Sequence, residues 1–467
     1  MNNIITRNIY YRLPTFTQNI LFSLYGFKLY RSRYNKFFHE YLRELRESEW
    51  WLAEHIRDYQ NKKLRQLVHH AYHTIPFYKK WFAENDVRPE NIRTMEDLSK
   101  LPILTKQMVK RNQTDLISRN CKKSNLIKVT TSGTTGTPLG IYKTEEALAF
   151  QWAIWWRHKA RFGLHLRDKH IMFGARLPIP VDHNKSPFWR YDYFNKRIYL
   201  SACHITEKNL PAIMNYLNSN DFDFYTGNPN ALYILSKLMI NNDIKLLRRP
   251  KYVVTGASAL LPSFEKAIRN TIGVTITEQY GMAEFAGNMS KCEYGKFHLD
   301  FECGIVEEKP IHGVEGYSSL IFTGWGNPAM PFIRYEVGDY GHRSSEQCSC
   351  GRYSICFDSI DGRTDDYIRT PDGRMVIGLS LVIKGAPGVK EMQIVQEKYD
   401  EIQLLIVPGK TYSNNDELLL KRELRRRIGE EMKIKFVYVD HIQKSTPGKF
   451  RAVVSKLPGG TIDKCNV

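Results

Sequence analysis

The loop Thr130–Pro138, TTSGTTGTP, brings hydroxyl side chains and two glycines into one turn. Gly133 and Gly136 allow the backbone to approach a ligand closely, while NH groups and hydroxyls can donate hydrogen bonds. This is the chemistry needed to surround an anionic phosphate. The loop is not a Walker loop, because no Gly-Lys-Ser/Thr follows at the required spacing. On these residues alone, a solvated turn is an equally good interpretation.

Four further short motifs follow along the chain. They are EQYGMAE at 278–284, RYEVGD at 334–339, GRTDDYI at 362–368 and PGKFR at 447–451. Together with the loop, their order and spacing resemble the adenylate-forming superfamily, whose enzymes activate a carboxylate with ATP. HHAYHTIPFYKKWF and LSKLPILTKQMVKRN resemble the phenylacetate–CoA ligase group, and LPTFTQNILFSLYGFKLYRSRYNKFF resembles its capsular-polysaccharide, CapK-like branch. The resemblance therefore covers nearly the whole chain.

The resemblance implies which residues bind ATP. The phosphates would be bound by Thr131, Ser132, Gly133, Thr134, Thr135 and Gly136. The adenine side would be lined by Gly256, Ala257, Ser258, Gln279, Tyr280, Gly281 and Met282. For residues 256–258, which follow a β-prone run, a plain strand-to-loop turn is the alternative.

The resemblance also implies roles for single charged residues. Glu284 would hold Mg²⁺, for which a carboxylate and phosphate oxygens are suitable ligands. Asp339 would accept hydrogen bonds from both ribose hydroxyls, and Arg363 would contact ribose or phosphate. Asp365 would be the hinge of a mobile terminal module. Lys449 would neutralise the attacking carboxylate and the phosphate, so Lys449 and Glu284 are the expected catalytic residues. The alternative for Lys449 and Glu284 is an ordinary surface charge, and that for Asp339 is an acid in a turn. For Arg363 and Asp365 the alternative is a salt bridge.

The chain departs from the superfamily pattern at three places. Leu139 follows the loop proline where a lysine is common, and Ala283 precedes Glu284 where a threonine is common. Both departures are shared in broad outline by the phenylacetate–CoA ligase group. The third is RTPDGRMVIG at 369–378, in place of a segment rich in glycine and asparagine. This difference leaves the acyl acceptor open.

Cysteines and one histidine form a second candidate site. Three thiols and an imidazole could hold a tetrahedral structural Zn²⁺. The expected ligands are Cys292, His298, Cys348 and Cys350, in the stretches KCEYGKFH and QCSCGR. Phenylacetate ligase-like proteins show similar placement of these residue types. Cys303 and Cys356 are competing ligands, and buried free cysteines are the alternative to a metal site.

The elements that would position these residues indicate an α/β protein. Residues 38–120 have helical periodicity that Pro76 interrupts, and strands alternate with helices up to about residue 310. Shorter β-rich segments follow, and the last hundred residues predict two strands, a charged helix and another strand. We expect a helical region at 1–120, an AMP-binding core with a small β-rich subdomain at 121–364, and a small mobile α+β domain at 365–467.

The formal net charge of +19 favours anionic ligands. No zinc-finger, zipper or RNP-like motif focuses the basic residues, so nucleic acid is not the expected partner. Eight cysteines and no secretory signal indicate a cytoplasmic protein with reduced thiols. No segment is long and apolar enough to span a membrane. The basic, aromatic-rich N-terminal arm either packs on its own domain or contacts an anionic membrane peripherally.

These observations predict an enzyme that uses ATP and Mg²⁺ to convert a small carboxylic acid into an acyl-adenylate. CoA is the leading acyl acceptor. One alternative delivers the acyl group to an amine or hydroxyl of a capsule or surface polysaccharide. The other is a nucleotide-binding scaffold without turnover, against which the intact Lys449, Glu284 and Asp339 argue. The sequence does not identify the acid.

Overall fold

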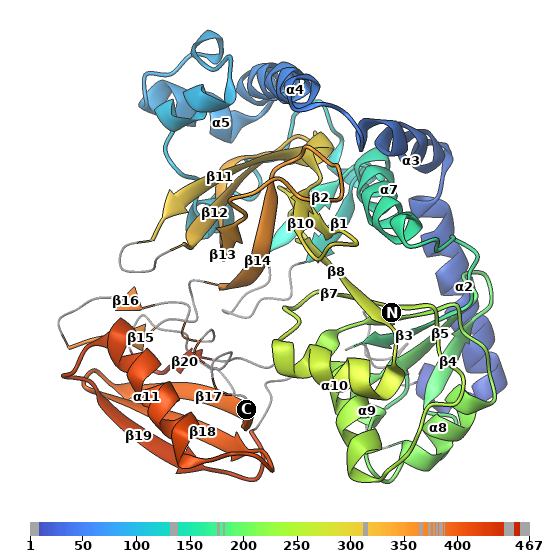
Figure 1. The fold of residues 1–467 in the computed structure, drawn as a ribbon. Coiled ribbons are helices and arrows are strands. Elements are labelled where there is room, and N and C mark those ends of the chain that lie inside the picture. The colour runs from blue at the N-terminus through green and yellow to red at the C-terminus, as the bar shows by residue number, and fades with distance from the viewer. Residues whose placement is uncertain are drawn as a thin grey trace.

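The computed structural model describes residues 9–130, 139–174, 178–180, 183–311, 316–363, 368–371, 375–376, 379, 382, 386, 388–442 and 453–457. Figure 1 shows a large body of sheet and helices, and a smaller C-terminal module in orange and red. None of the described helices has the length and apolar composition required to cross a bilayer.

A twelve-stranded mixed sheet runs through the large body. Its order is β11-β12-β13-β14-β10-β9-β8-β7-β6-β3-β5-β4. The parallel half consists of β3 (His170–Gly174), β5 (Arg197–Ser201), β6 (Phe224–Gly227), β7 (Tyr252–Gly256) and β8 (Thr275–Gly281), with β4 (Trp189–Asp192) as an antiparallel edge. It packs with α8 (Leu210–Asn218), α9 (Pro229–Asn241) and α10 (Pro262–Ile272) around one apolar core. The predicted alternation of strands and helices is confirmed.

The other half of the sheet is antiparallel. It consists of β9 (Asn288–Lys291), β10 (Phe297–Leu299), β11 (Gly304–Pro310), β12 (Ser318–Gly324), β13 (Phe332–Arg343) and β14 (Cys356–Arg363). The expected β-rich part is present, but its strands begin well before residue 310. Because β9 pairs with β8, the two halves form one continuous sheet, a long-range pairing that local patterning does not reveal.

The N-terminal region is helical, as predicted. Its helices are α2 (Thr15–Arg33), α3 (Lys36–Ser48), α4 (Ala53–Thr74), α5 (Pro76–Glu84) and α6 (Lys106–Arg111). Pro76 starts α5 because a proline lacks the NH that helix α4 would need to continue. Short 3-10 helices of the described residues lie at Pro89–Asn91, Met95–Lys100, Lys123–Asn125, Ala202–His204 and Phe301–Cys303. α4 and α5 pack on the antiparallel half of the sheet in a second apolar core.

A hairpin and a long helix connect this region to the sheet. β1 (Ile127–Thr130) pairs with β2 (Gly140–Lys143), so these strands flank the predicted phosphate loop. α7 (Glu145–Arg161) follows directly, and its N-cap Thr144 accepts a hydrogen bond from the NH of Ala147 at 3.0 Å. The hairpin therefore leads directly into the start of α7.

The C-terminal module has its own apolar core. β17 (Val389–Lys398), β18 (Glu401–Pro408), β19 (Lys433–Tyr438) and β20 (Val453–Ser455) form a sheet in the order β19-β18-β17-β20, with α11 (Asn414–Ile428) packed on it. β15 (Ile368–Arg369) and β16 (Met375–Val376) form a separate short pair. The predicted succession of two strands, a helix and a strand is confirmed. Lys237 of α9 contacts Glu391 of β17 at 3.4 Å, so the module touches the large body.

Candidate active site and metal centre

The carboxyl ends of β6, β7 and β8 meet at one edge of the sheet, the edge at which open α/β sheets bind ligands. Gly256 ends β7 and lies beside Gln279 of β8 in register. The hydroxyl of Ser258, just after β7, donates to Oδ1 of Asn228, just after β6, at 3.3 Å. The structure therefore brings together residues 256–258 and 279–281, whose adenine-side role remains a prediction, and adds Asn228, which the sequence analysis did not single out.

Three motif segments contain strained backbone. Ala257, Phe285 and Arg334 have φ values of 70°, 56° and 49°, in the left-handed region that side chains with a Cβ rarely adopt. Ala257 follows Gly256, Phe285 follows Glu284, and Arg334 begins RYEVGD. Such conformations persist only where packing enforces them, and they cluster at functional sites. Their coincidence with three motifs supports a functional interpretation of this region.

A hydrogen bond joins the adenine-side motif to the ribose motif. Tyr280 OH donates to Oδ2 of Asp339 at 2.7 Å, although the two residues come from β8 and β13. The backbone of Asp339 pairs with that of Arg363 on β14. Asp339 is half-buried and held by Tyr280, so its carboxylate has a fixed direction. An oriented carboxylate is suited to accept two neighbouring hydroxyl donors.

Glu284 lies within the loop that connects β8 to β9. It is half-buried, and its Oε1 accepts a hydrogen bond from Tyr335 OH at 3.2 Å. The carbonyl of Met282, in the same loop, accepts a bond from the amide of Gln151 at 3.3 Å. The loop is thus held from β13 and from α7, which fixes the position of the Glu284 carboxylate.

Lys143 is a site residue that the sequence analysis missed. It ends β2 and is only 1% exposed, and its Nζ donates to Oε1 of Gln151 at 2.8 Å and lies 5.3 Å from the ring centre of Phe285. Burial lowers the pKa of Lys143 to about 7, and the negative charge of Glu284 opposes that shift. The sequence did contain a signal for this burial: Lys143 is two residues after Ile141, so in a strand both side chains point to the same, buried face.

We expect Lys143→Met to change how stability depends on pH. The pKa of Lys143 in the folded protein lies below its ordinary value of 10.5, so above about pH 7 the unfolded chain binds one more proton. Wild-type stability should therefore rise relative to the variant by up to about 1.4 kcal/mol per pH unit. Urea denaturation between about pH 7 and about pH 9 measures this difference.

The matched control is Lys266→Met, at an exposed position of α10. Its difference from wild type should stay constant with pH. If the free energies of unfolding of Lys143→Met and of the wild type changed with pH in parallel, the lowered pKa of Lys143 would be contradicted.

Several predicted site residues lie outside the described residues. These are Thr131, Ser132, Gly133, Thr134, Thr135 and Gly136 of the phosphate loop, Asp365 of the hinge, and Lys449. The roles assigned to them remain predictions. The same holds for the side chain of Arg363, of which only the backbone pairing is described.

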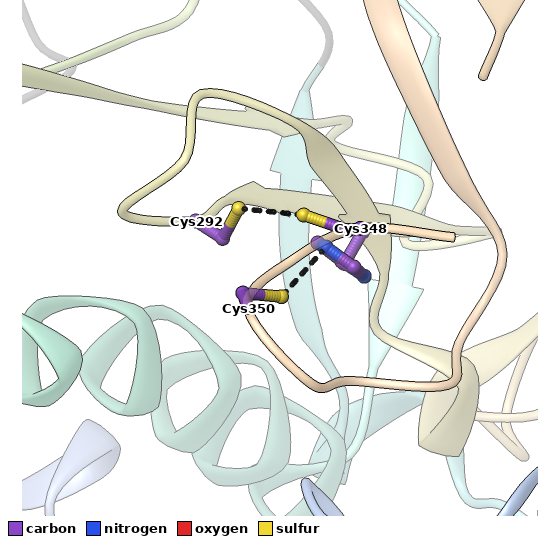
Figure 2. A group of neighbouring side chains, drawn as sticks. Cys292, Cys348 and Cys350 are labelled. Atoms are coloured by element: carbon purple, nitrogen blue, oxygen red, sulfur yellow. Dashed lines mark hydrogen bonds between the residues drawn. The ribbon is translucent and has the colours of Figure 1, made fainter. Parts of the chain in front are cut away.

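The four predicted zinc ligands form a cluster in the antiparallel half of the sheet. Cys292 directly follows β9, His298 lies on β10, and Cys348 and Cys350 lie between β13 and β14. Their ligand atoms all lie within 4.8 Å of one another. Sγ of Cys292 and Sγ of Cys348 are 3.6 Å apart, and Sγ of Cys350 lies 3.3 Å from Nε2 of His298 (Figure 2).

This geometry fits a tetrahedral zinc ion. Zn–S bonds of about 2.3 Å place two sulfur ligands about 3.8 Å apart, close to the separation of Cys292 and Cys348. Nδ1 of His298 lies 3.3 Å from the carbonyl of Ser354, an acceptor that orients the ring and leaves Nε2 for the metal. Burial raises the pKa of Cys348 to about 12 and lowers that of His298 to about 4. Zinc binding itself remains a prediction.

Neither competing thiol belongs to the group of four ligand atoms. Cys303 is buried in another core, where its Sγ contacts the carbonyl of Asp300 at 3.0 Å. Cys356 packs beside the cluster, but its Sγ lies near the carbonyl of Glu346. The geometry therefore favours the four predicted ligands over either alternative.

A buried ion network attaches the cluster to the N-terminal helices. Arg352, two residues after Cys350, donates to Glu49 at the end of α3 at 2.6 Å, and Arg161 of α7 donates to the same carboxylate at 2.7 Å. These three side chains are at most 7% exposed. Buried ion pairs of this kind are costly to break, because removing one partner leaves an uncompensated charge. The cysteine and histidine cluster therefore lies where the antiparallel half of the sheet packs against α3 and α7, a position suited to a structural role.

We expect Cys348→Ser to abolish the binding of one zinc ion per chain and to lower the midpoint of thermal unfolding by several degrees, because bound metal contributes folding free energy. Metal analysis of protein prepared without chelators, together with calorimetry, measures both effects. Cys356→Ser should keep the metal. Wild-type protein without zinc, or equal zinc in Cys348→Ser, would overturn the assignment.

Comparisons with known proteins agree with this description. The family model described as CapK C-terminal domain matches residues 368–456. Protein CapK of Staphylococcus aureus is 26% identical over 454 residues, which cover 96% of this chain and 99% of that protein. A phenylacetate-coenzyme A ligase of Thermus thermophilus is 25% identical over 341 residues, which cover 69% of this chain and 73% of that one.

The fold is also similar to that of a solved ligase. The crystal structure of 2-hydroxyisobutyryl-CoA ligase in the postadenylation state, in complex with 2-HIB-AMP, superposes with a TM-score of 0.66 at 16% identity, covering 87% of this chain and 91% of that one. The predicted fold class and the predicted resemblance are thus confirmed. The chain is thus similar to CapK along nearly its whole length and to phenylacetate-coenzyme A ligases over about two thirds of it, and its fold is that of a solved adenylate-bound CoA ligase.

Proposed function

We propose that this ligase uses ATP to convert a carboxylic acid into an acyl-adenylate and then transfers the acyl group to CoA. The observation that carries the proposal is the convergence of three separated motifs. Residues 256–258, 278–284 and 334–339 meet at the carboxyl edge of the parallel strands, linked by the bond between Tyr280 and Asp339. This edge is where an α/β sheet binds a nucleotide.

In the first step, a carboxylate oxygen attacks the α-phosphorus of ATP, and pyrophosphate leaves. Two anions approach each other, so the site must supply positive charge and hydrogen-bond donors. Asp339 holds the ribose, and Glu284 is the ligand that would hold Mg²⁺, which would neutralise phosphate charge. The phosphate loop 131–136 and Lys449 act on the phosphates and on the attacking carboxylate. Arg363 supports the ribose or phosphate.

In the second step, the acceptor attacks the acyl carbon, and AMP leaves. The domain organisation that we propose serves both steps: a helical region at 1–120, an AMP-binding core at 121–364, and a terminal module from 365 that turns about Asp365. Lys449 enters the site for the first step and leaves it for the second. Motion of such modules sets the order of steps in many enzymes.

CoA is the acceptor in the proteins named as CoA ligases that resemble this chain. A second acceptor is favoured by a specific observation. The terminal module matches the CapK C-terminal domain at 368–456, whereas the phenylacetate-coenzyme A ligase match covers only 69% of the chain. The alternative is therefore transfer to an amine or hydroxyl of a surface polysaccharide, with the same first step.

The experiment is a panel of aryl, fatty and amino acids tested for carboxylate-dependent pyrophosphate release, first without and then with CoA. The proposal predicts release with one class of acid and formation of the acyl-CoA thioester when CoA is added. Release without thioester formation would favour the sugar acceptor. No release with any acid at high protein concentration would contradict the enzyme activity and favour a nucleotide-binding scaffold.

A further inference from the structure

Helix α2 buries small and polar side chains and exposes large apolar ones, the reverse of the usual arrangement for a helix on the surface of a soluble protein. Its buried residues are Gln18, Ser23 and Gly26, while its exposed residues include large apolar side chains. The exposed apolar residues of α2 are Phe16, Ile20, Leu21, Leu24, Tyr25 and Phe27, with Phe16 70% exposed and Leu24 53% exposed. A contiguous exposed apolar patch on one element marks an interaction surface.

The polar face of α2 is fixed against β4 by specific hydrogen bonds. Gln18 Oε1 accepts from Nε of the fully buried Arg190 at 2.7 Å. Ser23 Oγ donates to the carbonyl of Tyr191 at 3.1 Å and accepts from the NH of Tyr193 at 3.1 Å. Turning the helix to bury its apolar residues would break these bonds and leave the buried Nε of Arg190 without its Gln18 acceptor, which is costly for a charged group in the interior. The apolar face is therefore held outward.

Close packing also fixes this orientation. Gly26 lies directly over Asp192 of β4, and a Cβ at this position would come within 2.3 Å of the carboxylate. Only a glycine permits this approach. In Figure 1 the helix runs along the outer side of the molecule, beside β4 and β5.

The apolar surface continues from α2 onto the turn between β4 and β5. Phe27 packs against Phe194 with ring centres 4.7 Å apart, and Tyr193 and Phe194 are 53% and 48% exposed. Along the helix, Phe16, Ile20, Leu24 and Phe27 are spaced three or four residues apart and form one row. We call this surface, formed by the exposed apolar residues of α2 together with Tyr193 and Phe194, the α2 face.

The exposed charged residues of α2 itself are both positive. The exposed polar residues of α2 are Lys28 and Arg31, each one turn beyond the apolar rows. No Asp or Glu occurs before Glu40 in the sequence. An apolar helix face bordered by Lys and Arg is the surface that binds the interface of an anionic bilayer. A second copy of the chain fits less well, because its own α2 contains no Asp or Glu to pair with Lys28 and Arg31.

We propose that the α2 face docks the protein onto an anionic phospholipid surface, with α2 lying in the plane of the membrane. The apolar rows enter the boundary between headgroups and acyl chains, and Lys28 and Arg31 contact the anionic headgroups. The proposal does not depend on the identity of the acid or acceptor. In this arrangement the α2 face attaches the large body to the membrane on the side where α2 packs on β4.

The test is flotation of the full-length protein with vesicles of phosphatidylglycerol and phosphatidylcholine, and with vesicles of phosphatidylcholine alone. We expect binding to the anionic vesicles that weakens as salt is raised, because the electrostatic part is screened. Leu24→Glu should reduce binding at least about tenfold, since it places a charge in the apolar row. Phe16→Glu, at a still more exposed position, provides a second variant that the fold should tolerate.

The matched control is Leu247→Glu. Leu247 is 75% exposed but lies between α9 and β7, outside the α2 face, so its substitution should leave vesicle binding unchanged. Failure of the wild type to bind anionic vesicles would overturn the proposal, as would undiminished binding of both Leu24→Glu and Phe16→Glu. Light scattering that shows a dimer dissociated by Leu24→Glu would also overturn it, because a second copy would then cover the α2 face.

Discussion

Glu284→Gln is expected to lower the rate of carboxylate-dependent pyrophosphate release by about 10²- to 10³-fold, the loss typical of removing one group that stabilises transition-state charge. Glutamine keeps the size of the side chain and one acceptor oxygen, but it loses the charge that would attract Mg²⁺. The carboxylate is held by Tyr335 and acts on the pKa of Lys143, so it lies within the site. Initial rates over a series of Mg²⁺ concentrations measure the effect.

Tyr335→Phe is the matched control for this prediction. It removes the hydroxyl that donates to Glu284 but leaves the carboxylate, so we expect a loss of only a few-fold, equivalent to about 1 kcal/mol for one hydrogen bond. Equal losses in Tyr335→Phe and Glu284→Gln would mean that Glu284 acts through this hydrogen bond alone. A wild-type rate in Glu284→Gln would exclude it from the catalytic site.

Lys449→Ala is expected to slow adenylate formation by about 10²- to 10³-fold and to change the affinity for ATP by only a few-fold. The reason is that the lysine would act on charge that develops in the transition state, whereas ATP is bound mainly by other residues. Single-turnover formation of the acyl-adenylate, measured beside ATP binding, separates the two effects. Similar losses in rate and in affinity would instead indicate a residue that binds ATP in the ground state.

Lys456→Ala is the control in the same terminal segment. Lys456 pairs with Glu397 at 2.7 Å, and both side chains are about half exposed. Such a surface pair contributes little to stability, about 0–1 kcal/mol, so this variant should keep both rate and fold. If Lys456→Ala lost as much activity as Lys449→Ala, the loss would reflect damage to the terminal module.

The candidate site could be proposed from the sequence because each motif is local. Glu278–Glu284 and Arg334–Asp339 could be recognised in isolation, and the structure brings Tyr280 to Asp339 as their shared role requires. Lys143 could not be recognised in this way. Its burial depends on Gln151 of α7 and on Phe285, which reach it only in the folded chain.

The candidate metal ligands likewise could not be chosen from local sequence alone. Spacing alone left Cys303 and Cys356 as competing ligands. The choice follows from the pairing of β10 with β14, which brings His298 to the turn that carries Cys348 and Cys350. Because β14 is far from β10 in the sequence, no local pattern predicts this pairing.

Helix α2 illustrates a different limit. The sequence left open whether the N-terminal arm packs on its own domain or contacts a membrane. In the structure α2 packs on β4 through Gln18 and Ser23, and its apolar rows remain exposed. Apolar residues usually predict the buried face of a helix, but here buried Arg190 requires a polar partner and so determines the orientation.

The most direct test of the acyl-adenylate is the fate of the carboxylate oxygen. An acid that supports pyrophosphate release is labelled with oxygen-18 in both carboxylate oxygens and turned over with ATP and the active acceptor. Because the carboxylate oxygen attacks the α-phosphorus and the acyl C–O bond later breaks, the account predicts one labelled oxygen in each AMP. AMP without label, or label in inorganic phosphate with release of ADP, would contradict it.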